Sequence, residues 1–177
     1  MTTAVLVFHP NLTSSKANRA LMEAARRAAA EGADIVVRDE YAAYSDGRID
    51  VAAEQSLLEK ASRVVLQFPV WWYSAPPLLK SWLDEVLAFG WAYGPGGEAL
   101  RGKEIAVAVT AGGGHDEYEL DGPHKCTMED VLTPYRATAE YVGARWGRHF
   151  AVYGIDENVT AATIEASARE YRTYLAG

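Results

Sequence analysis

The chain has 177 residues, of which 49% are hydrophobic, and this is enough for one domain with a sizeable core. Its 17 basic and 24 acidic side chains give a formal net charge of −7, and the Lys and Arg residues are scattered, which argues against nucleic-acid binding. The lone Cys126 excludes an internal disulfide or a cysteine metal cluster, and no signal-like or bilayer-spanning run is present. We therefore expect a single cytoplasmic domain over residues 1–177.

Short apolar runs alternate with helical patterns along the chain. Nearly continuous apolar runs predict buried parallel strands at residues 3–8, 64–68 and 105–109, with flanking strands at 34–38 and about 148–153. Apolar pairs that recur every four residues predict helices around residues 20–29 and 78–87, with further helices at about 51–61, 128–143 and 161–175. This alternation predicts an α/β fold, a doubly wound five-stranded parallel sheet in flavodoxin order with helices on both faces.

Polar residues crowd the segment between the first strand and the first helix. His9 ends the strand, and hydroxyl and amide side chains follow it up to Asn18. Unpaired backbone N–H groups at a helix N-terminus attract anions, and these side chains add donors, so the segment has the composition of a phosphate-binding loop. An ordinary N-cap made by one of the hydroxyls is the alternative reading.

An aromatic turn follows the strand at residues 64–68. The run from Phe68 to Lys80 contains Trp71, Trp72 and Tyr73 between prolines and leads into a helix. In open α/β sheets small molecules bind at the carboxyl ends of strands, and flat apolar walls with nearby backbone polar groups suit a flavin ring. The alternative is that these rings only cap the core.

Three consecutive glycines follow the strand that ends at Val109. Gly112, Gly113 and Gly114 let the backbone approach a ligand closely and present its N–H groups without obstruction. A flexible turn without a ligand is the alternative. Tyr118 and His124 come shortly afterwards and place a phenol and an imidazole near this turn.

The position of the three turns carries more weight than any one of them. Each follows a core strand, so we expect all three to converge on one edge of the sheet. The first turn lacks the glycine patterns of nucleotide triphosphatases and of direct dinucleotide sites. The strand ends lack the carboxylates of a phosphate-receiver domain, and the four histidines lack metal-ligand spacing, so no metal site is predicted.

Several motifs together resemble the flavodoxin-like NAD(P)H:quinone reductases, a family that includes the ancillary flavoproteins of Kef glutathione-gated potassium-efflux systems. The resemblance covers nearly the whole chain and is closest to the Kef ancillary branch. Its motifs are Ile49–Gln55, Trp72–Lys80 and Gly90–Gly94 with Gly96 and Gly97.

The resemblance implies roles for residues at matching positions. The flavin phosphate would be held by His9, Ser15, Lys16, Ala17 and Asn18, and the ring would be flanked by Pro69, Val70, Trp71, Trp72 and Tyr73. The pyrimidine edge of the ring would face Thr110, Ala111, Gly112 and Gly113. Tyr118 and His124 resemble catalytic residues that compensate charge on the reduced flavin, Tyr118 also contacting the cofactor and His124 the substrate. Trp91 and Tyr93 resemble substrate-binding aromatics contributed by the second subunit of a dimer.

Two positions depart from the family pattern. Trp71 stands where relatives often have Gln, and Ala111 stands where they often have a second Thr, so side-chain contacts there differ while backbone contacts are expected to remain. The chain also lacks the C-terminal extension of the mammalian enzymes, which favours FMN over FAD.

The resemblance implies a homodimer that takes hydride from NADH or NADPH and reduces quinones or similar electrophiles by a ping-pong mechanism. His124 is a candidate proton source, because an imidazole titrates near neutral pH. A regulatory role is the alternative: a cytoplasmic ancillary subunit that binds a Kef-type potassium/proton antiporter at the inner face of the membrane and activates it.

Overall fold

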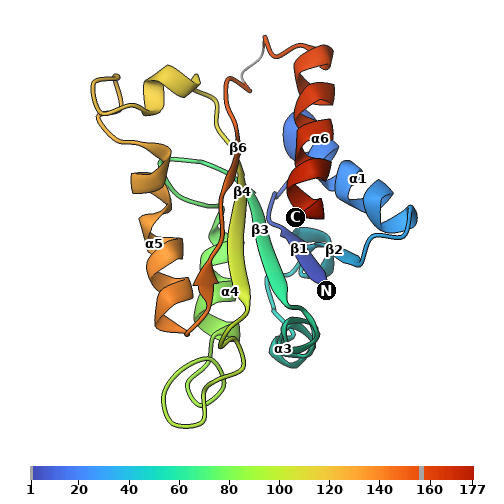
Figure 1. The fold of residues 1–177 in the computed structure, drawn as a ribbon, viewed down its shortest axis with the longest axis vertical. Helices are drawn as coiled ribbons and strands as arrows, with labels where there is room; N and C mark the ends of the chain where they lie inside the picture. The colour runs from blue at the N-terminus through green and yellow to red at the C-terminus, as the bar shows by residue number, and fades with distance from the viewer. Residues whose placement is uncertain (1, 156–157) are drawn as a thin grey trace.

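The computed structural model describes residues 2–155 and 158–177. Its centre is a parallel sheet in which β1 (Thr3–Val7), β2 (Ile35–Asp39), β3 (Arg63–Pro69) and β4 (Glu104–Thr110) lie in the order β2-β1-β3-β4 (Figure 1). These strands are the apolar runs of the sequence, and every residue of β1 is buried. The predicted flavodoxin order and the doubly wound parallel sheet are confirmed.

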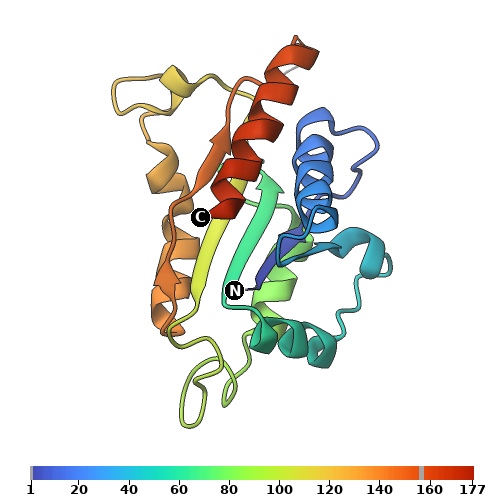
Figure 2. The same cartoon turned by 45° about the vertical axis from the view of Figure 1, so that its right-hand side comes forward.

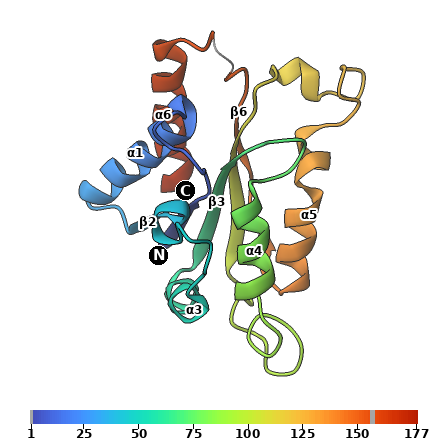
Figure 3. The same ribbon diagram turned by 180° about the vertical axis from the view of Figure 1, so that it is seen from behind.

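Helices cover both faces of the sheet, as predicted. On one face α1 (Lys16–Ala30) packs beside α6 (Ala161–Ala176), and on the other lie α3 (Val51–Lys60), α4 (Pro77–Val86) and α5 (Met128–Tyr141) (Figures 1 and 3). Side chains of Ser15, Asp50, Thr127 and Thr160 cap the first turns of four of them. Each such cap satisfies an otherwise unpaired N–H group, which explains where these helices begin. Among the described residues, no helix is both long and apolar enough to cross a membrane.

The fifth strand is broken: the strand predicted at about 148–153 is present at residues 150–152, and a short piece before it, at residues 145–146, was not predicted. Two short pieces, β5 (Arg145–Trp146) and β6 (Phe150–Val152), both pair with β4. Ile105 faces Trp146 while Ala108 faces Phe150, so this strand holds one extra residue and its pairing is interrupted. Gly147 lies in the gap, where a Cβ atom would come within 2.8 Å of Glu104 Oε1.

Two short elements were not predicted because their length gives no periodic signal. The helix α2 (Glu40–Ala43) follows β2 directly, and the Asp39 side chain accepts a hydrogen bond from the Ala42 N–H group. The 3-10 helix η1 (His115–Tyr118) follows the glycine turn. Both lie near the carboxyl edge of the sheet, where the chain is otherwise in turns (Figure 2).

Two fully buried carboxyl groups, Glu40 of α2 and Glu54 of α3, lie beside Arg38 of β2. Glu54 accepts hydrogen bonds from the Tyr44 hydroxyl at 2.5 Å and from Trp82 Nε1 at 2.9 Å, and it pairs with Arg38 Nη2 at 2.7 Å. Glu40 lies beside this group, 3.6 Å from Arg38 Nε, and neither of its oxygens has a hydrogen-bond partner among the described residues. Burial, with the charge of Glu54 as a second cause, raises the pKa of Glu40 to about 8.

This raised pKa predicts how stability changes with pH. Between pH 5 and 8 Glu40 keeps a proton in the folded chain and loses it in the unfolded chain, so rising pH favours unfolding. Relative to Glu40→Gln, the wild type should lose roughly 1–3 kcal/mol of unfolding free energy over this range. Urea titrations at several pH values measure it. The exposed Glu165→Gln variant should follow the wild type, and a Glu40→Gln curve parallel to the wild type would refute the assignment.

Candidate functional site

The three turns named from the sequence meet at the carboxyl edge of the sheet. The parallel pairing of β1, β3 and β4 brings their ends together, as expected. The His9 and Trp71 rings lie 5.6 Å apart in an edge-to-face arrangement, which joins the first turn to the second. The Val70 N–H group donates to the Thr110 carbonyl at 2.8 Å, which joins the second turn to the third.

His9 is oriented as a donor. Its side chain is buried, and the Asn11 N–H group donates to Nδ1 at 3.1 Å. Since Nδ1 accepts this bond, the neutral ring carries its hydrogen on Nε2. Burial lowers the pKa of His9 below its ordinary value, an effect partly opposed by the charge of Asp39. The ring is thus a neutral N–H donor at the end of β1.

The start of α1 has an N-cap, and a buried side chain connects it to β4. Ser15 Oγ accepts from the Asn18 N–H group at 3.2 Å, so the predicted N-cap exists. The Asn18 side chain is fully buried and donates to Thr110 Oγ1 at 2.8 Å. It therefore ties the helix start to β4, while Lys16 is exposed in the first turn and Ala17 is buried.

Gln67 is a site residue that sequence reasoning missed. It is fully buried on β3, and its Nε2 donates to the Asn18 carbonyl at 2.9 Å. Its Oε1 has no hydrogen-bond partner among the described residues. The signal was available in the sequence, since Gln67 is the one polar side chain inside the apolar run at residues 64–68.

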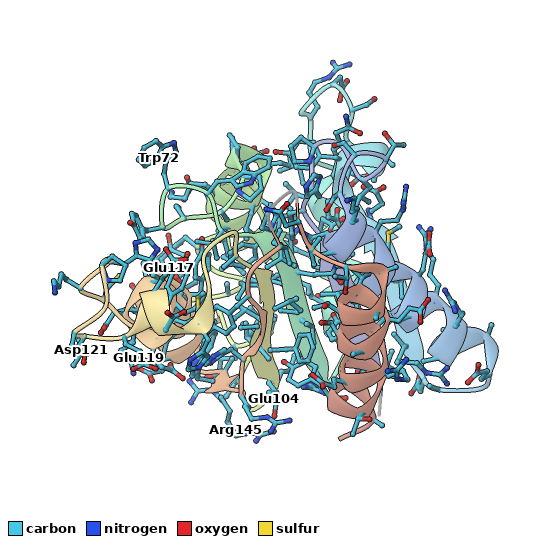
Figure 4. The ribbon with its side chains drawn as sticks, turned by 90° about the horizontal axis from the view of Figure 1, so that it is seen from above. Trp72, Glu104, Glu117, Glu119, Asp121 and Arg145 are labelled. Carbon is cyan, nitrogen blue, oxygen red and sulfur yellow. The ribbon has the colours of Figure 1, made fainter. Side chains whose placement is uncertain are left out.

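The aromatic turn has an unusual backbone. Trp71 and Ser74 exchange two backbone hydrogen bonds, and the residues between them, Trp72 and Tyr73, have φ angles of 49° and 59°. These signs match a type I′ turn, where Asn and Gly are usual and bulky side chains are costly. Trp72 is 94% exposed and projects from the rim of the molecule (Figure 4), whereas Pro69 is buried and Val70 half-buried. Such strain is typical of ligand-binding turns.

In the glycine turn, the backbone groups of Ala111 are hydrogen-bonded to neighbouring segments, whereas the space beside Gly112 is open. Ala111 donates to the Val152 carbonyl and accepts from the Ile155 N–H group, so its backbone is already paired. A Cβ atom at Gly112 would meet no described atom within 4 Å. The open approach to this turn is therefore over Gly112 rather than Ala111.

Tyr118 and His124 come together beside the aromatic turn. Their rings lie 4.9 Å apart, and the Tyr73 hydroxyl is 3.2 Å from His124 Nδ1. Tyr118 is buried, and burial raises the pKa of its phenol above the ordinary value. Tyr118 therefore keeps its proton at neutral pH.

Trp91 and Tyr93 do not join this site within one chain. They lie in the loop between α4 and β4, at the amino-end edge of the sheet (Figure 1). Trp91 Nε1 donates to Glu59 Oε1 at 2.9 Å, and the Tyr93 ring packs against Tyr141 at 5.5 Å.

The described residues contain no group of three His, Cys, Asp or Glu side chains that could hold a metal ion. The site brings together a neutral imidazole donor, a capped helix start, three adjacent aromatic side chains, an open glycine and a Tyr–His pair. These groups are suited to a phosphate at one end and a flat ring at the other.

Comparisons with known proteins agree with this geometry. The KefF ancillary protein of the glutathione-regulated potassium-efflux system of Salmonella schwarzengrund is 42% identical over 175 residues, covering 97% of this chain and 93% of that protein. General stress protein 14 of Treponema denticola, solved in complex with FMN, is 40% identical with a TM-score of 0.92, covering 99% and 98% of the two chains. An NADPH-quinone reductase of P. pentosaceus is 26% identical with a TM-score of 0.84, covering 99% and 98%.

The family comparison extends over nearly all of the sequence. Residues 1–175 match the family described as Flavodoxin-like fold. The strand order, the helices on both faces and this match lead to one conclusion: the chain belongs to the flavodoxin-like fold family.

Proposed function

We propose that the protein is an NAD(P)H-dependent FMN oxidoreductase that reduces quinones or similar electrophiles. The observation that carries the proposal is the convergence of a phosphate-type loop, an aromatic turn and an open glycine at one sheet edge. The similarity to an FMN-bound structure and to an NADPH-quinone reductase supports it.

The residues at the edge fit FMN from its phosphate to its ring. His9 offers Nε2–H, and the N-terminus of α1 with Ser15 and Lys16 adds donors and positive charge for the phosphate. Trp71, Trp72 and Tyr73 are the exposed rings that would flank the isoalloxazine. The buried Asn18 and Gln67 would hold the loop and act on the ligand indirectly.

FMN, when bound, would supply the hydride chemistry that links NADH or NADPH to a second substrate. The residues of this chain orient the ring, keep the space over Gly112 open and offer donors where negative charge develops. Tyr118 stays a neutral hydrogen-bond donor, and His124 is the group beside it that exchanges protons.

We also infer a homodimer in which Trp91 and Tyr93 complete the site of the partner. Large apolar side chains are exposed on this chain outside the aromatic turn, including Phe89 at 69% and Tyr141 at 71%. An open groove of about 580 Å³ between α4 and α5 is lined by Leu83, Leu87, Tyr93 and Tyr141 among others. A two-fold interface over this region would bury these groups.

The similarity to KefF favours a second candidate function, that of a regulatory subunit. In this role the protein would bind a Kef-type antiporter and take a peripheral position at the cytoplasmic face of the membrane. The acidic dimer would present the same surface twice to a two-fold symmetric partner.

The cofactor assignment predicts a ligand-dependent effect of His9→Ala. Losing a hydrogen bond to a charged phosphate should raise the Kd for FMN about 10–100-fold, because such bonds contribute roughly 1.5–3 kcal/mol. Riboflavin lacks the phosphate and serves as the matched ligand, so its Kd should be unchanged. Fluorescence titration measures both, and equal weakening of FMN and riboflavin would contradict the assigned role of His9.

The dimer is tested by complementation between two inactive variants. One chain carries His124→Ala and the other Trp91→Ala, and the two are unfolded and refolded together. If Trp91 acts across the interface, one site of each mixed dimer regains both residues, so quinone reductase activity should recover to about a quarter of the wild-type value. Activity no higher than that of the separate variants, or a fully active monomer in light scattering, would contradict the arrangement.

Catalysis and regulation are separated by a variant that binds FMN without turning over. Tyr118→Phe combined with His124→Ala should slow turnover about 10–1000-fold while FMN stays bound. The variant is then expressed in cells that carry the cognate antiporter, and potassium efflux is measured. Lost efflux with normal flavin content supports the enzyme, whereas full efflux would make catalysis secondary to binding.

A further inference from the structure

Three polar side chains form a chain beside the aromatic turn. Glu117 Oε2 lies 3.4 Å from His124 Nε2, and His124 Nδ1 lies 3.2 Å from the Tyr73 hydroxyl. Glu117 comes from η1, His124 from the loop after it and Tyr73 from the turn after β3. Figure 4 shows Glu117 on the same side of the molecule as Trp72, the neighbour of Tyr73 in the chain. Both ring nitrogens of His124 thus face a polar partner.

The backbone around Gly113 holds Glu117 close to the imidazole. The Gly114 N–H group donates to Glu117 Oε1 at 2.7 Å, which fixes the carboxylate while Oε2 faces His124. A Cβ atom at Gly113 would lie 3.1 Å from the Glu117 carboxyl carbon and 3.2 Å from His124 Nε2. This glycine therefore permits the close approach of the two side chains.

The two partners of His124 determine which of its ring nitrogens can pass a proton to Tyr73. A carboxylate only accepts, so Glu117 faces a hydrogen on Nε2. When the imidazole is protonated, Nδ1 also carries a hydrogen, and this one faces the Tyr73 oxygen. Tyr118 contacts the imidazole edge-to-face and is buried, whereas Tyr73 is 47% exposed in the aromatic turn. Tyr73 is therefore the phenol that reaches outward from His124.

We propose that Tyr73 delivers the proton that quinone reduction requires, with His124 as its proton source and Glu117 as the positioning residue. The inference rests on the proposed function. Reduction of a quinone to a hydroquinone consumes one hydride, supplied by NAD(P)H through the bound flavin, and one proton. The Tyr73 O–H bond breaks as the O–H bond of the product forms, and the Nδ1 proton of the His124 imidazolium moves to the Tyr73 oxygen. This leaves a neutral imidazole with its hydrogen on Nε2, and solvent then returns a proton to Nδ1.

The test compares acceptors that differ in their need for a proton. Reduced holoenzyme is mixed in a stopped-flow instrument with a benzoquinone, which takes a hydride and a proton, or with ferricyanide, which takes electrons alone. Tyr73→Phe keeps the ring beside the flavin and removes only the hydroxyl. It should slow oxidation by the quinone about 10–100-fold, a much larger change than any in ferricyanide oxidation or in flavin reduction by NADPH. Glu117→Gln should slow the quinone step several-fold, and Glu119→Gln, which removes a charge on the same loop beside His115, should leave it unchanged.

Each outcome decides between a donor and a structural role. Equal quinone rates in Tyr73→Phe and wild type overturn the proposal, as does a parallel loss of the ferricyanide reaction, because a misplaced flavin would slow both. A wild-type rate in Glu117→Gln removes the positioning role. The solvent deuterium isotope effect on the quinone step should be present in the wild type and diminished in Tyr73→Phe. Failure to bind FMN or to be reduced by NADPH would instead refute the proposed function.

Discussion

The parallel hydrogen bonding of β1, β3 and β4 is the constraint on which the site depends. Their registers place Val7 beside Gln67 and Pro69 beside Thr110, so the turns after the three strands begin side by side. Because the strands are buried on both faces, a slip in register would disturb both cores, and the edge is therefore fixed with them. The register of the sheet therefore places side chains that are far apart in the sequence next to one another at this edge.

Buried hydrogen bonds of Asn18 and Gln67 connect the first turn to the sheet. Asn18 bonds to Thr110 through its side chain, and Gln67 bonds to the Asn18 carbonyl. Each bond contributes about 1 kcal/mol, but breaking one would leave a buried polar group unsatisfied at a larger cost. The phosphate-type loop is thereby held against β3 and β4, so its N–H groups are arranged before any ligand arrives.

The sequence predicted the architecture well because its signals were long and periodic. The apolar runs at residues 64–68 and 105–109 and the four-residue repeats are features that burial on a sheet requires. The broken fifth strand escaped prediction, since an extra residue opposite β4 leaves no mark in an apolar pattern. The burial of Glu40 also escaped it, because a charged residue after a strand is usually solvated.

The candidate site was predictable to the level of its turns and less so within them. His9, the aromatic turn and the glycine turn were identified, and their convergence is confirmed by the structure. Three features of the site depend on backbone geometry that residue types do not encode. They are the backbone pairing of Ala111, the inward orientation of the Asn18 side chain, and the Glu117–His124–Tyr73 chain. The left-handed backbone of Trp72 is the strongest case, since its residue type argues against that conformation.

If the three turns form one flavin site, binding of FMN should protect all of them together, and hydrogen exchange measured with and without FMN shows whether it does. Mass spectrometry would follow peptides that contain residues 9–18, 70–74 and 110–118 as FMN is added. We expect slower exchange in all three peptides, with the same dependence on FMN concentration. Protection confined to one turn, or appearing in the three at different concentrations, would contradict a single shared site.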